Sequence, residues 1–221
     1  MHIAVHPASA LVATLVAAFA LPTEVVLAQP ASPPQHLDPV NRTLWSDERL
    51  GIRFTYPPVW QQATATQPST RVVVNWRLRK SKALLATCYI ETHGPESSSL
   101  ARAEPAQIHK DIDSIARSAL RNFQARAPGA RLVEAKAAVQ DGHPVIFLVR
   151  EGTVENLDRK IHNKSYSIVT VWRSTEVNFE CGTSVYGPEY ASLDGGQRLI
   201  QQVEAGILHV LKALQFDRVA R

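Results

Sequence analysis

The chain has 221 residues, which is enough to bury one hydrophobic core and requires no second domain. Its formal net charge is only +4 at pH 7, and the charged residues are scattered along the sequence. This excess permits attraction to anionic surfaces, but scattered charges of this kind are typical of ordinary solvated faces.

The first 28 residues have the pattern of an export signal. Residues 8–21 form an uncharged apolar run that is too short to span a bilayer comfortably as a helix. Val26 and Ala28 then occupy the small-residue positions of a signal-peptidase site, which predicts cleavage after Ala28. The segment before the run has no Lys or Arg, which departs from the usual pattern, and the alternative is a buried core helix.

The remainder of the chain favours a soluble exported protein. Residues 29–44 are rich in proline and predict a flexible leader. No later run is long and apolar enough to cross a membrane, so we expect no transmembrane segment in the mature chain. The preference for Arg over Lys and the many Ala residues suggest a GC-rich bacterial genome. We therefore expect a periplasmic or secreted location.

The stretch FTYPPVW predicts a strand that ends in a corner. Apolar and polar residues alternate over residues 50–56, which indicates a half-buried strand. Pro57 removes a backbone donor and Pro58 fixes a second φ angle, so the chain must turn here. We expect Trp60 to pack under this turn, and the alternative is that it stacks on a ligand.

The next two strands predict a hairpin over residues 71–79 and 83–91. Its tip carries Arg79, Lys80 and Lys82, and Arg77 lies close by. This basic cluster could contact phospholipid head groups or an acidic partner, although charged hairpin tips are commonly only solvated. No aromatic residues interleave with the charges as binding to single-stranded nucleic acid would require, so we expect no nucleic-acid partner.

Two later segments have the apolar period of amphipathic helices. The first stripe consists of Ile108, Ile112, Ile115, Ala119 and Phe123, with Pro105 at an early position and a stop at residues 127–129. The second stripe consists of Ile200, Val203, Ile207, Val210, Leu211 and Leu214, with Asp194 as the expected cap. Each stripe predicts packing against an apolar face of a sheet.

Two more hairpins are predicted between these helices. Asp141 and Gly142 favour a type I′ turn, which needs positive φ at both central residues. The strand after this turn has apolar residues on both sides over residues 145–149, so we expect both of its faces to be covered. The following hairpin is expected to turn at residues 174–176.

The two cysteines of the chain, Cys88 and Cys181, lie in segments that read as strands, and each shares a face with apolar neighbours. In an oxidising compartment such a pair favours a disulfide over two buried thiols, provided that the strands are close. Redox or metal chemistry is disfavoured because the sequence has no CxxC and no zinc-ligand spacing.

Together the elements predict a single α+β domain over residues 45–221, with a mainly antiparallel sheet packed by two long amphipathic helices. The FTYPPVW corner, the long helix after a hairpin, the DGHP turn and the closing helix resemble the PsbP-like fold over residues 50–216. That fold includes exported bacterial proteins and the extrinsic photosystem subunit. Its members are generally non-catalytic accessory, assembly or binding proteins, so the resemblance implies an α/β sandwich with a binding role.

No catalytic motif stands out in the sequence. The stretch GTSVYG has one residue too many for a serine-hydrolase elbow, so Ser184 is expected to be a strand-end hydroxyl. Three histidines, His93, His143 and His162, fall at strand ends or turns and could meet at one edge of the sheet beside Glu91. Their spacing matches no ligand signature, and we expect no cofactor and no bound metal.

Three functions remain open at this point. The favoured one is an exported, non-enzymatic binding or accessory protein with an envelope or periplasmic protein as its partner. The second is a small-ligand carrier with a pocket between helix and sheet that is lined by Trp60, Trp76 or Trp172 together with Tyr186. The third is a metal-dependent hydrolase that uses the three histidines.

Overall fold

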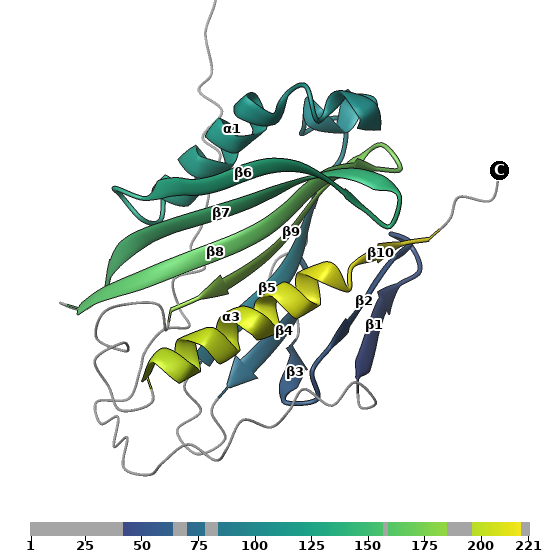
Figure 1. The fold of residues 1–221 in the computed structure, drawn as a ribbon. Helices are drawn as coiled ribbons and strands as arrows, with labels where there is room; N and C mark the ends of the chain where they lie inside the picture. The colour runs from purple at the N-terminus through teal and green to yellow at the C-terminus, as the bar shows by residue number, and fades with distance from the viewer. Residues whose placement is uncertain (1–41, 64–69, 78–83, 157–158, 185–195, 218–221) are drawn as a thin grey trace, which may run out of the picture.

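The computed structural model describes residues 42–63, 70–77, 84–156, 159–184 and 196–217 (Figure 1). Its strands are β1 (Thr43–Asp47), β2 (Ile52–Tyr56), β3 (Trp60–Ala63), β4 (Thr70–Arg77), β5 (Leu84–His93), β6 (Arg131–Gln140), β7 (His143–Asn156), β8 (Arg159–Trp172), β9 (Thr175–Thr183) and β10 (Gln215–Phe216). Its helices are α1 (Ile112–Gln124), α3 (Gly196–Lys212) and the short 3-10 helices η1 (Leu100–Arg102) and η2 (Pro105–Gln107). The predicted signal, residues 1–28, lies outside the described residues.

The strands form two sheets. The larger has seven strands in the order β3-β4-β5-β9-β8-β7-β6, and every neighbouring pair is antiparallel. The smaller has the order β1-β2-β10. Helix α1 lies on one face of the large sheet, and α3 lies on the other face together with the small sheet (Figure 1). The predicted α+β sandwich with a mainly antiparallel sheet is therefore confirmed.

The main hydrophobic core lies between the large sheet and α3. The helix contributes the stripe that its 3.6-residue period predicted, and Val203, Ile207 and Val210 are fully buried there. Phe54 of β2 and Phe179 of β9 meet beside this stripe, with ring centroids 4.9 Å apart. Burying a side chain of this size contributes about 1.5–3 kcal/mol, so this layer is the principal source of stability.

A second, smaller apolar cluster lies on the opposite face, under α1. The helix packs mainly on β6 and β7, where Ala116 meets Ile146 and Leu148. It begins at Ile112, later than the apolar period suggested, because Pro105 starts the separate helix η2. Ile108 is nevertheless fully buried in this cluster, so it continues the stripe from a turn that precedes the helix.

Two turns have the chemistry that the sequence predicted, whereas the hairpin expected to turn at residues 174–176 turns at Arg173 and Ser174, which have φ of 51° and 54°, because Thr175 already pairs with Trp172. Asp141 and Gly142 have φ of 51° and 77°, as a type I′ turn between β6 and β7 requires. At the double-proline corner the amide of Trp60 donates to the carbonyl of Pro57 at 2.9 Å, which closes a turn between β2 and β3. The Trp60 side chain is only 3% exposed, so it packs in the core beneath the corner.

The small sheet includes two strands that the sequence did not reveal. β1 begins at Thr43, two residues before the start that we assigned to the domain, and it pairs with β2. Its Trp45 packs on Phe54 with ring centroids 4.9 Å apart. β10 has only two residues, and it pairs with β2 at the end of the described chain.

One glycine allows a loop to approach the large sheet closely. A Cβ atom on Gly152 of β7 would lie 2.7 Å from the Cβ of Ala130 and 3.1 Å from that of Ala127. We therefore expect Gly152→Ala to lower the free energy of unfolding by about 1–3 kcal/mol, through overpacking. Urea denaturation measures this effect. Gly182→Ala is the control, because its Cβ would meet nothing closer than the Lys164 carbonyl oxygen at 4.0 Å, and a loss of equal size there would contradict the explanation.

Candidate functional site

A polar groove of about 500 Å³ lies between α1 and the part of the large sheet that α1 does not cover. We call it the α1 groove. Its polar lining comes from four elements and the segments that flank α1. It consists of Glu91 and His93 on β5, Glu176, Asn178 and Glu180 on β9, Arg150 on β7, Ser114, Ser118, Arg121 and Asn122 on α1, Ser99 and Asp111 before α1, and Arg126 after it. This volume lies within the range of about 300–1,000 Å³ that is usual for ligand sites.

The strand period explains why this face of β9 is polar. Val177, Phe179 and Cys181 point into the main core, so the alternate residues Glu176, Asn178 and Glu180 line the groove. On α1, Ser114 and Ser118 are one helical turn apart and line the groove, while the apolar stripe of the helix rests on β6 and β7. The groove thus lies where the polar face of β9 and the polar side of α1 meet.

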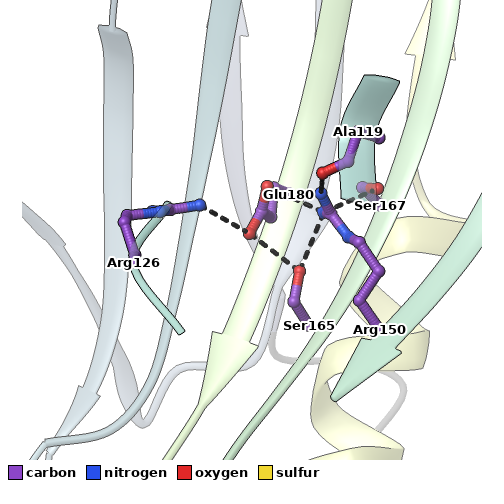
Figure 2. A network of polar contacts seen from close by, with 6 residues as sticks. All are labelled: Ala119, Arg126, Arg150, Ser165, Ser167 and Glu180. Atoms are coloured by element: carbon purple, nitrogen blue, oxygen red, sulfur yellow. Dashed lines mark hydrogen bonds and ion pairs between the residues drawn. The ribbon is translucent and has the colours of Figure 1, made fainter. Parts of the chain in front are cut away.

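The floor of the groove holds a network of buried charges (Figure 2). Arg150 of β7 and Glu180 of β9 form an ion pair with Nη2 and Oε2 2.9 Å apart. Ser165 Oγ donates to Glu180 Oε1 at 2.7 Å, and Arg150 Nη2 lies 3.0 Å from Ser165 Oγ and 3.1 Å from Ser167 Oγ. Arg150 Nη1 donates to the carbonyl of Ala119 at 3.0 Å, so the network ties α1 to the sheet.

These contacts keep the Glu180 carboxylate ionised. Its side chain is 5% exposed and that of Arg150 is 3% exposed, whereas Arg126 is 53% exposed with Nη2 3.8 Å from Glu180 Oε1. Burial raises the pKa of Glu180. The guanidinium groups of Arg150 and Arg126 and the hydrogen bonds to Ser165 and Arg150 lower it by more, so that the pKa falls to about 2. The carboxylate is therefore charged throughout the physiological pH range.

Arg126 connects the buried network to the open part of the groove. Burial lowers its pKa, but Tyr89, Glu180 and Glu91 raise it by more, so the guanidinium stays charged. Burial and the nearby Glu180 raise the pKa of the half-buried Tyr89, whose hydroxyl therefore stays protonated. The Arg126 guanidinium also lies over the ring of Phe123, 5.8 Å from its centroid.

The opposite end of the groove is acidic. His93 and Glu176 are register partners on β5 and β9, and Asp111 lines the same groove from just before α1. The Ser98 hydroxyl donates to the Glu176 carboxylate. The Ser98 Oγ atom also accepts hydrogen bonds from the backbone amides of Leu100 and Ala101 at the start of η1.

One feature of the sequence points to this site. Arg150 shares a strand face with the buried Ile146 and Leu148, and Glu180 lies between the buried Phe179 and Cys181. A charge on a strand face that is expected to be covered needs a partner of opposite charge. The sequence alone could not indicate that these two residues would be partners.

The three histidines of the proposed metal site are not brought together. Each has its own contact, namely His93 with the Glu91 carboxylate at 3.7 Å, His143 with the Val171 carbonyl at 2.8 Å and His162 with the Thr153 hydroxyl at 3.2 Å. Burial lowers the pKa of His143 more than its contact with Val171 raises it. Over the residues that the structure describes, no group of three or more His, Cys, Asp or Glu side chains could hold a metal ion.

The tryptophans of the proposed aromatic pocket lie in two separate places within the main core. Trp60 and Trp76 pack against each other with centroids 6.0 Å apart. Trp172 packs on Phe216 at 5.2 Å, and its Nε1 donates to the carbonyl of Leu50 at 2.8 Å. Tyr186 lies outside the described residues. The structure therefore places Trp172 apart from Trp60 and Trp76, and the part of the predicted pocket that Tyr186 would line is not described.

The predicted basic cluster is described only in part. Arg77 is the last residue of β4, whereas Arg79, Lys80 and Lys82 lie outside the described residues. Asp194, the expected cap of the second helix, also lies outside them.

Cys88 and Cys181 are joined by a disulfide. They are directly opposite each other on β5 and β9, with Cα atoms 4.0 Å apart, and both are fully buried. The bond thus joins the two strands that carry the sheet side of the α1 groove, from the opposite face. Disulfides are typical of proteins that fold in oxidising compartments outside the cytosol.

Within the described part of the chain, no helix is both long and apolar enough to cross a membrane.

Comparison with known proteins gives similarity at the level of the fold. The chain resembles the cyanobacterial PsbP protein (CyanoP) from Synechocystis, at 16% identity over 85% of this chain and 99% of that chain, with a TM-score of 0.45. It also resembles LpqN, a protein involved in cell envelope biogenesis of Mycobacterium tuberculosis, at 11% identity over 83% and 88%, with a TM-score of 0.45. A protein of unknown function from Pseudomonas aeruginosa aligns at 18% identity over 74% and 93%, with a TM-score of 0.39.

No family model and no curated protein matches the sequence. The resemblance to PsbP that the FTYPPVW corner and the element order suggested is therefore found in the fold.

Proposed function

We propose that the chain is an exported, non-enzymatic binding protein of the bacterial envelope, and that the α1 groove receives a segment of its protein partner. The observation that carries this proposal is the Arg150–Glu180 network, which joins α1 to the sheet at the floor of the groove. A site whose walls are already held in place loses little conformational entropy when a partner binds, and this favours affinity.

The electrostatics of the groove favour binding over proton-transfer catalysis. A general acid or base works best with a pKa near the operating pH. Glu180 has a pKa of about 2 and is already engaged by Arg150 and Ser165, so it is poorly suited to exchange a proton at neutral pH. The exposed rim residues Ser114, Ser118 and Asn122 are suited to hydrogen bonding with a partner.

Export is supported by two independent features. The first 28 residues have an apolar run and a small-residue site, as a cleaved signal requires. The buried disulfide between Cys88 and Cys181 is of the kind that persists in the periplasm or outside the cell. Together they support an oxidising compartment as the place of action.

Site-specific photo-cross-linking tests the proposed surface. A photoreactive residue is placed at Ser118 in the groove, or at Gln201 on the exposed side of α3, in the protein made from residues 29–221. Each protein is irradiated in envelope extract from the source bacterium. We expect one reproducible cross-linked protein from Ser118 and none from Gln201.

A second substitution shows whether the captured protein occupies the groove. Ser114→Trp places a large ring in the groove, so it should remove the product formed at Ser118. The matched control Gln197→Trp, on the exposed surface of α3, should leave that product unchanged. Capture that survives Ser114→Trp, or equal capture from Ser118 and Gln201, would contradict the proposal.

A further inference from the structure

We propose that the α1 groove recognises an extended peptide segment that carries a basic side chain and an acidic side chain about four residues apart. This inference rests on the proposed function, because it specifies the chemistry of the segment that the same groove would hold.

The groove separates its charges along its length. The ion pair of Glu180 with Arg150 neutralises two of the charged groups in the lining. The remaining carboxylates belong to Glu91, Asp111 and Glu176, and the remaining guanidinium groups belong to Arg121 and Arg126. Beyond the buried ion pair, the groove therefore presents charge of both signs to a ligand.

The two walls place the carboxylates of Asp111 and Glu176 and the guanidinium groups of Arg121 and Arg126 toward opposite ends, whereas Glu91 lies between them, opposite Asn178. On α1, Asp111 precedes the first turn and Arg121 lies in the last turn, so about 15 Å of helix separates them. On β9, Glu176 is at the start, and Glu180, which Arg126 approaches, lies four residues later, at about 13 Å. Figure 1 shows α1 and β9 running in a similar direction, so the basic ends of both walls coincide.

Contacts at each end support this alignment. At the acidic end, Ser98 of the segment before η1 donates to Glu176. At the basic end, Arg150 reaches from the floor to the carbonyl of Ala119 in α1, and Arg126 approaches Glu180. Strand β9 is thus joined to the segment before η1 at the acidic end and to the turn after α1 at the basic end.

The length and the middle of the groove suit a peptide. An extended chain advances about 3.3 Å per residue, so four residues span the separation between the charged ends. Between those ends the lining offers the hydroxyls of Ser114 and Ser118, the amide of Asn178 and the carboxylate of Glu91, which is the register partner of Asn178. The Asn178 Oδ1 atom is buried and has no hydrogen-bond partner in the described chain, and a turn of this side chain would present it to a peptide N–H.

Calorimetric titration with short synthetic peptides tests the inference. The probe is acetyl-Lys-Gly-Ser-Gly-Glu-amide, and the comparison peptides have two Lys or two Glu at the same positions. We expect the mixed-charge peptide to bind about fivefold more tightly than either comparison peptide. We also expect this preference to shrink as the salt concentration rises to about 0.5 M.

A charge reversal should change which peptide is preferred. Arg121→Glu makes the basic end of the groove more acidic, so it should weaken binding of the mixed-charge peptide and strengthen binding of the two-Lys peptide, each by about fivefold. Arg198→Glu makes the same change of charge on the exposed surface of α3 and should alter neither affinity. Equal binding of all three peptides, or an equal effect of Arg198→Glu, would overturn the inference.

The two tests fail separately. If Ser118 captures a protein that Ser114→Trp excludes, but the peptides bind without charge preference, the groove is the binding surface and the proposed ligand chemistry is wrong. If neither capture nor peptide binding occurs, both proposals are wrong.

Discussion

Glu180→Gln is expected to lower the free energy of unfolding by about 3–5 kcal/mol, because it leaves the buried Arg150 guanidinium without its counter-charge. Urea denaturation at neutral pH measures this loss. The surface variant Glu134→Gln removes a carboxylate from an exposed pair with Lys136, and it should change stability by less than about 1 kcal/mol.

The same carboxylate predicts how stability depends on pH. The pKa of Glu180 in the folded state, about 2, lies below its ordinary value of 4.5. The resulting stabilisation is therefore complete above about pH 5 and is lost as the pH falls toward 2, by on the order of 3 kcal/mol. Glu180→Gln should lack this acid-dependent part.

A double substitution shows whether stability is lost because one charge of the pair is left unpaired, or because any substitution at this site is destabilising. Arg150→Met combined with Glu180→Leu removes both charges, so the double variant should be more stable than Glu180→Gln alone. If the free energy of unfolding of Glu180→Gln lies within about 1 kcal/mol of that of the unsubstituted protein, the buried network does not hold α1 to the sheet as described.

The second large effect is expected from the disulfide. Cys88 and Cys181 are 93 residues apart in the sequence, and joining them restricts the unfolded chain. The double variant Cys88→Ala with Cys181→Ala should lose about 4–5 kcal/mol in the loop-entropy model. Denaturation of this variant, compared with the unsubstituted protein in the presence and absence of reductant, measures the effect.

The reductant supplies the control for the disulfide. Once the bond is reduced in the unfolded chain, the unsubstituted protein should show nearly the stability of the double variant, whereas the double variant should be insensitive to reductant. A double variant that is as stable as the oxidised protein would show that the bond contributes little, despite lying between opposed residues in the core.

The position of α1 explains why the protein has a groove at all. The helix has 13 residues and packs mainly on β6 and β7, so strands β9 and β5 keep a polar face beside it. The opposite face of the same strands is covered by α3 and the small sheet and is apolar. One large sheet thus provides the main core on one face and a polar recess on the other.

Local rules of sequence determined most of the elements, although not the strands β1 and β10. Alternation of apolar residues indicated the strands, and Asp141 with Gly142 adopts the positive φ angles that a type I′ turn needs. The two prolines, Pro57 and Pro58, produced the corner beneath which Trp60 is buried. These features depend on residues that are close in the sequence. Backbone sterics and the spacing of apolar side chains decide which helix, strand or turn forms there.

Only the tertiary structure decided which distant residues meet. The sequence marked Cys88 and Cys181 as candidates for a bond, but their pairing needed β5 and β9 to be neighbours. It did not indicate that Arg150 would meet Glu180, or that the three histidines would have separate partners. Such contacts depend on strand order and on where a helix rests, and both result from the burial of the whole chain, which no local pattern contains.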